Sequence, residues 1–186
     1  MERAAAIIKY FVTAFCAAVW FSIPAGAQEA DLDALFAELQ AATPETHATI
    51  AADINLALQK SGSAAMDLLY RRGVDALEAG EYDAAAEHFS AAIDHAPDFA
   101  EAFHGRASAF FNLGLTGPAL DDLRMVLVLQ PRHFEAMFGI GQILETLDRP
   151  AQALEVYEAV LTIYPLEEKS LAAIERLALE LDGQAI

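Results

Sequence analysis

The chain has 186 residues, of which 28 are acidic and 11 are basic, so its formal net charge at pH 7 is −17. That length suits one domain of ordinary size. Because binding to nucleic-acid phosphates needs a basic face, the charge argues against a nucleic-acid partner and favours basic or neutral partners. The single cysteine cannot form a disulfide within the chain.

Residues 1–27 have the layout of a secretory signal peptide. Arg3 and Lys9 begin it, an apolar stretch spans 10–23, and small residues precede an expected cleavage site after Ala27. We therefore expect a bacterial protein that is periplasmic or secreted, and a retained N-terminal membrane anchor is the alternative. The segment holds two basic residues, one acidic residue and the cysteine. The mature chain then has nine basic and 27 acidic residues, a formal charge of −18 and no thiol.

Residues 28–65 predict a pair of helices. Apolar residues at helical spacing mark the first helix: Leu32, Leu35, Phe36 and Leu39. The second helix is expected to have its cap at Thr43, Pro44 in its first turn, and its end near Lys60. The pair is either a degenerate repeat or a separate docking hairpin. We expect it to pack as a cap on the region 66–99, because its apolar face would otherwise be exposed.

From residue 66 the sequence repeats with a period of 34 residues. Three columns carry the period: Ala85, Ala119 and Ala153; Phe89, Leu123 and Tyr157; Pro97, Pro131 and Pro165. Each proline ends a helix, because the residue before proline is disfavoured in the helical conformation. The pattern predicts three hairpins over 66–99, 100–133 and 134–167. Their expected helices are 66–79, 83–96, 100–113, 118–130, 134–147 and 150–164.

This order of small, aromatic and proline positions resembles the tetratricopeptide repeat (TPR), written W-x2-L-G-x2-Y, then A-x3-F, then P. The sequence resembles short exported bacterial TPR proteins, and this resemblance implies an all-α, right-handed TPR helical-hairpin solenoid of three repeats with an N-terminal helix pair. Residues 168–186 would form a C-terminal capping helix and tail. The apolar face of that helix is expected to comprise Leu171, Ile174, Leu177, Ala178 and Leu181.

The resemblance also implies an acidic, non-enzymatic scaffold or adaptor for protein binding. In TPR proteins the first helices of the repeats line a concave groove that holds an extended peptide or a partner helix. Carried over position by position, the groove residues are Tyr70, Val74, Glu78, Glu101, His104, Ser108, Phe111, Glu135, Phe138, Gln142 and Glu145. This aromatic and acidic lining predicts a basic or apolar segment of a protein or peptide as the partner.

Two alternatives concern the same groove residues. Tyr70, Phe111 and Phe138 could instead pack between neighbouring first helices, as aromatic stripes at helical spacing usually do. Chaperone-binding members of the family hold a C-terminal carboxylate with lysine and asparagine, and Tyr70, His104 and Phe138 stand where the first clamp lysine would be. The sequence therefore argues against a carboxylate clamp.

No motif in the sequence predicts catalysis, a metal or a cofactor. His88 and His95 are seven residues apart, whereas chelating pairs on a helix are three or four apart. The serines lie in no G-x-S-x-G motif, and the glycines in 139–143 lack the third glycine of a dinucleotide loop. Asp121 and Asp122 are expected on a solvated helix face. Two alternative functions stay open: a membrane-anchored periplasmic assembly factor, as in cytochrome c biogenesis, and an enzyme without a recognisable motif.

Overall fold

The computed structural model of the protein describes residues 25–184, so the predicted signal peptide over 1–27 lies almost wholly outside the described residues. The chain divides into two units, 1–34 and 35–186. The described part of the first unit is the beginning of helix α2 (Ala25–Gln40). Across 25–184, no helix has the length and apolar character that crossing a bilayer requires.

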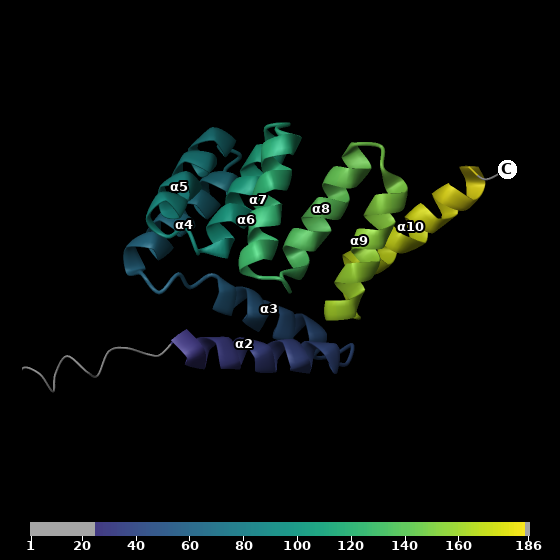
Figure 1. Cartoon of the computed structure of the whole chain (residues 1–186), viewed down its shortest axis with the longest axis horizontal. Coiled ribbons are helices and arrows are strands. Elements are labelled where there is room, and N and C mark those ends of the chain that lie inside the picture. Colours follow the sequence, from purple (N-terminus) through teal and green to yellow (C-terminus); the bar gives the residue numbers. More distant parts are fainter. Residues whose placement is uncertain (1–24, 185–186) are drawn as a thin grey trace, which may run out of the picture. The chain divides into compact units, whose positions relative to one another are not determined.

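Residues 25–184 contain nine helices and no strand (Figure 1). After α2 they are α3 (His47–Leu58), α4 (Ala64–Glu78), α5 (Tyr82–His95), α6 (Ala100–Asn112), α7 (Thr116–Leu129), α8 (Phe134–Thr146), α9 (Pro150–Ile163) and α10 (Glu168–Gln184). The expected all-α fold of stacked hairpins is confirmed. One boundary differs, because a turn over 44–46 delays α3 and places Thr46 rather than Thr43 at its N-cap.

Helices α4 to α9 form three hairpins, and each hairpin packs on the next through its second helix. The helix ends lie close to the predicted ones because the local signals are strong. Gly80 and Gly114 follow α4 and α6 with φ of 76°, a left-handed conformation that suits glycine at a helix C-terminus. Pro150 begins α9, where its missing N–H has no helical partner to lose.

The columns of the repeat form the core between the hairpins. Ala85, its equivalents one and two periods later, and Phe89 are fully buried. Phe89 fills the space between α4 and α6 so closely that a Cβ added to Gly73 would lie 2.6 Å from its ring, and one added to Gly105 would lie 2.4 Å away. The large residue of each repeat therefore fills the space between that repeat and the next one, as the sequence predicts.

This packing makes a testable prediction at Gly141. A Cβ at this position would lie 2.4 Å from Tyr157, whose side chain is fully buried. We expect Gly141→Ala to lower the free energy of unfolding by about 1–3 kcal/mol, because overpacking forces the ring and its neighbours to move. Urea denaturation measures the loss. The matched control is Gly117→Ala, since a Cβ at Gly117 meets nothing within 4 Å. Equal stability of the two variants would contradict the register described above.

Asp122 does not lie on a solvated face, which corrects the sequence prediction. Its side chain is nearly buried, and the Arg106 guanidinium donates to both of its oxygens at 2.8 Å. This hydrogen bonding raises the pKa of Arg106. Asp121, next to it, is exposed as expected. The difference arises because one residue per turn of α7 faces α6, and spacing alone does not show which carboxylate that residue is.

The buried face of α10 also differs from the expected one. Leu177 and Ala173 are buried as part of a cluster with Tyr157, whereas Leu171 and Ala178 are exposed. Tyr157 already fills the space at the end of the third repeat. The face of α10 toward Tyr157 therefore holds Ala173 and Leu177, and Leu171 lies outside it.

The expected packing of the N-terminal helix pair on residues 66–99 is wrong. The structure joins α3 to the third repeat instead, where Asn55 donates a hydrogen bond to Glu135 at 2.8 Å and His47 bonds to the Tyr164 hydroxyl. Figure 1 shows α3 crossing the end of the hairpins at which α8 begins. Two further contacts extend this attachment, since Gln40 donates to the Thr162 carbonyl and Arg132 lies over the Phe36 ring. Within the third repeat, Tyr164 packs against Phe134.

Candidate binding pocket

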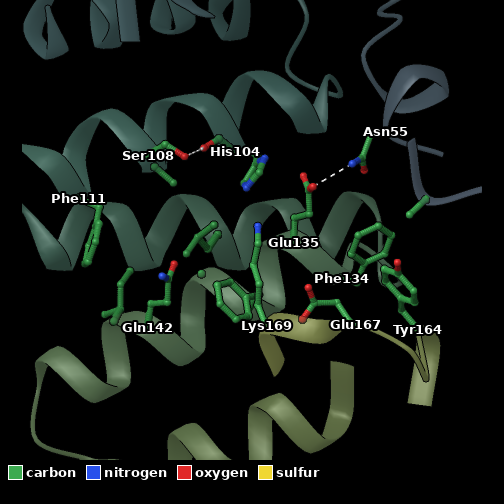
Figure 2. A pocket seen from close by; sticks show the side chains of 16 residues that line it. Asn55, His104, Ser108, Phe111, Phe134, Glu135, Gln142, Tyr164, Glu167 and Lys169 are labelled. Carbon is green, nitrogen blue, oxygen red and sulfur yellow. Dashed lines mark hydrogen bonds between the residues drawn. The ribbon is translucent and has the colours of Figure 1, made fainter. Parts of the chain in front are cut away.

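A pocket of about 520 Å³ lies between α3, α6, α8 and α10 (Figure 2). Its walls combine aromatic and aliphatic side chains with several polar groups. The lining residues are Ala51, Asn55, His104, Ala107, Ser108, Phe111, Leu123, Phe134, Glu135, Phe138, Gly139, Gln142, Ile143, Tyr164, Glu167 and Lys169.

Six of the eleven groove residues expected from the sequence line this pocket: His104, Ser108, Phe111, Glu135, Phe138 and Gln142. The structure places the other five elsewhere. Tyr70 and Glu101 are buried, Val74 packs against the core, and Glu78 is exposed. Glu145 accepts hydrogen bonds from Tyr157 and Arg176 in a shallower neighbouring depression.

Sequence reasoning missed the pocket residues that lie outside the repeats. Asn55 comes from α3, whose packing partner the sequence did not reveal. Lys169 had a signal that could have found it, because the 34-residue period continues from Glu101 through Glu135 to Lys169. The first turn of α10 thus lies where the first helix of a fourth repeat would begin, and it has a basic residue where the repeats have acidic ones.

The aromatic walls of the pocket are anchored in the cores of the repeats. The ring of Phe138 lies with its centroid 5.2 Å from that of Tyr157, and Phe111 packs against the cluster of the first two repeats. Both rings are half-buried, so each keeps surface toward the pocket. Packing behind them fixes their positions, which leaves preformed apolar surface for a ligand.

A buried carboxylate beside the pocket joins the first helices of all three repeats. His133 accepts the backbone N–H of Ala136 at its Nδ1, so its Nε2 carries the hydrogen and donates to Glu101 at 2.8 Å. Tyr70 donates its hydroxyl to the other oxygen of Glu101, and His104 Nδ1 lies 3.6 Å from that oxygen. Tyr70, Glu101 and Ala136 lie on α4, α6 and α8, respectively.

The electrostatics of this cluster follow from burial and pairing. Burial opposes the charged form of Glu101, but hydrogen bonds from His104 and His133 outweigh it and lower the pKa of Glu101 to about 2. Burial likewise opposes charge on His104, but the bond to Glu101 and the charges of Glu101 and Glu135 raise its pKa above the ordinary value. Burial and then Glu101 raise the pKa of Tyr70. Glu101 is therefore a structural anion.

The same cluster offers a donor set that a transition metal could use. Ligand atoms of Glu101, His104 and His133 all lie within 4.8 Å of one another, and two imidazoles with a carboxylate suit zinc. Coordination through His133 Nε2 would require its hydrogen to move to Nδ1, where it would meet the N–H of Ala136. That would break the N-cap of α8, so the geometry favours a hydrogen-bonded joint. His88 and His95 lie on α5, outside this cluster. His88 is half-buried and His95 is exposed.

Stacked pairs of antiparallel helices with small residues at their crossings define a helical-repeat protein. The tetratricopeptide-repeat family model matches residues 70–127 and 118–168, and the chain belongs to this family.

A TPR repeat-containing protein of Rhizobium etli is 33% identical over 153 residues, which cover 82% of this chain and 75% of that protein. The small glutamine-rich tetratricopeptide repeat-containing protein 2 of Mycosarcoma maydis is 32% identical over 108 residues, or 56% of this chain. This chain spans only 31% of that fungal protein.

Solved structures with similar folds include complexes with peptides. The first TPR of Spaghetti (RPAP3) bound to an HSP90 peptide has a TM-score of 0.60 at 23% identity and covers 63% of this chain and 93% of its own. The type III secretion chaperone SycD of Yersinia enterocolitica, in complex with a peptide of the translocator YopD, has a TM-score of 0.60 at 16% identity and covers 63% and 95%. At these identities the likeness shows the fold alone.

Proposed function

We propose that this protein is a non-enzymatic interaction scaffold that binds a segment of a partner protein in the pocket between α3, α6, α8 and α10. The observation that carries the proposal is the preformed aromatic surface of Phe111 and Phe138, which is packed from behind and lies beside the polar groups of the lining. Both peptide complexes described above support it, since a related fold holds a peptide in each. Aromatic anchors typically contribute 2 kcal/mol or more each to such contacts.

The chemistry of the pocket favours an apolar or basic segment. Two of the acidic groups expected in the groove already have partners, because Glu101 is buried with His133 and Glu145 is paired with Arg176. The acidic character of the lining therefore rests on Glu135 and on Glu167, which the sequence reasoning did not include. A net charge of −17 would add long-range attraction for a basic partner.

We propose further that the protein works outside the cytoplasm, with a mature chain that begins after Ala27. The charged start, apolar stretch and small residues of 1–27 support this placement. Helix α2 begins at Ala25, so such cleavage would remove only its first three residues. N-terminal sequencing of the protein purified from its own cells decides between this form and an uncleaved, membrane-anchored assembly factor.

Site-specific photo-cross-linking in living cells tests the scaffold proposal. We expect a photoreactive amino acid at Gln142, which is exposed at the pocket, to give one discrete adduct with a partner protein. The same group at Val128, which is 73% exposed on α7 and outside the lining, is the matched control and should give none. Adducts from Val128 alone, or equal adducts from both positions, would place the binding surface elsewhere.

A further inference from the structure

Lys169 projects from the first turn of α10 into the middle of the pocket (Figure 2). Its ammonium nitrogen lies 5.9 Å from the centroid of the Phe138 ring, within range of a cation–π contact. Among the described residues, 25–184, no ion pair joins this ammonium to a carboxylate. The chain thus places its own cation over an aromatic ring in an otherwise acidic lining.

The two carboxylates of the lining each have one oxygen without a hydrogen bond from the described residues. Glu135 accepts from Asn55 at Oε1, and Glu167 accepts from the backbone N–H of Ser170 at Oε2. These bonds hold both side chains in place. They leave Oε2 of Glu135 and Oε1 of Glu167 free to accept hydrogen bonds from a ligand in the pocket.

From this arrangement we infer that Phe138, Glu135 and Glu167 form a seat for an arginine side chain of the partner segment, and that the Lys169 ammonium occupies the space over the Phe138 ring in the free protein. The inference rests on the proposed function. A guanidinium matches the seat better than an ammonium does, because it stacks flat on an aromatic ring and donates to two carboxylates at once. Lys169 is exposed and flexible, so it can swing into solvent when the guanidinium enters.

A nuclear magnetic resonance titration tests the seat without knowledge of the partner. The probes are N-acetyl-arginine methylamide and its citrulline counterpart, which has nearly the same shape and no charge. We expect the arginine probe to give saturable shifts at Phe138, Glu135 and Lys169, and the citrulline probe to bind at least tenfold more weakly. Lys169→Met removes the internal competitor and keeps an apolar stem, so it should tighten arginine binding several-fold.

Two matched variants sharpen the test. Glu135→Gln keeps the bond from Asn55 and removes one of the two negative charges of the seat, so it should weaken arginine binding several-fold while Glu167 remains. Lys60→Met, an exposed position outside the pocket, should leave binding unchanged. Weaker arginine binding in Lys169→Met, or equal binding of both probes, overturns the inference. The absence of saturable shifts, together with a persistent adduct at Gln142, would reject the seat and leave the scaffold proposal intact.

Discussion

Replacing Arg106 by alanine is expected to lower the free energy of unfolding by about 3 kcal/mol or more, because it leaves the buried carboxylate of Asp122 without its partner. The guanidinium donates to both oxygens of Asp122 and to the Ser90 hydroxyl, and it also stacks near the rings of Phe103 and Phe110. Removing it costs the desolvation of the remaining charge as well as these contacts. Urea denaturation at pH 7 measures the loss.

The exposed pair of Arg124 and Asp121 supplies a control on α7, the helix that carries Asp122. Its two side chains are mostly exposed, and exposed ion pairs contribute little to stability. We expect Arg124→Ala to change the free energy of unfolding by less than about 0.5 kcal/mol. If the losses for Arg106→Ala and Arg124→Ala were similar, Asp122 would have to be solvated after all.

The second large effect concerns Glu101 and its dependence on pH. The folded protein holds the pKa of Glu101 at about 2, against an ordinary value of 4.5, so its charged form contributes on the order of 3 kcal/mol to stability. Because the folded pKa is the lower one, this contribution is present above pH 4.5 and is lost as the pH falls toward 2. Glu101→Gln should therefore destabilise the protein by about 3 kcal/mol at pH 6, and the difference from wild type should nearly vanish at pH 2.

The pKa of His104 shifts in the opposite direction. Its folded pKa is raised, so its contribution is present below pH 6.5 and is lost as the pH rises through the folded pKa. Wild-type stability should thus be greatest between pH 4.5 and 6.5, and Glu101→Gln should flatten both sides of the profile. Glu87→Gln, at an exposed position, is the control and should follow the wild type. Parallel profiles for Glu101→Gln and the wild type would mean that Glu101 is not the anion of this joint.

The sequence by itself determined the three hairpins and the packing between them. The 34-residue period specifies the small residues at helix crossings, the large residue between repeats and the proline after the second helix of each repeat. These features depend on neighbours within one or two repeats. The helices of the structure accordingly begin and end close to the predicted positions.

The candidate site was predictable only in the part that the repeats build. His104, Ser108, Phe111, Glu135, Phe138 and Gln142 were identified from their register, and all of them line the pocket. Register left open whether Tyr70 faces the groove or packs between helices, and it did not reveal that Glu101 is buried. A first-helix position faces the groove or the next helix according to the local crossing of the helices, which the pattern of residue types does not record.

Only the tertiary structure decided where the ends of the chain pack and which charges are paired. Amphipathic spacing shows that α3 has an apolar face, but several surfaces could cover such a face. In the structure α3 bonds to Glu135 and Tyr164 at the third repeat. Asp121 and Asp122 are adjacent residues of the same type, and the sequence pattern does not distinguish them. Asp121 is exposed, however, and Asp122 is buried against Arg106. Lys169 reaches the pocket because α10 occupies the place of a further first helix. Burial and pairing are set by residues distant in the chain, so a local pattern cannot specify them.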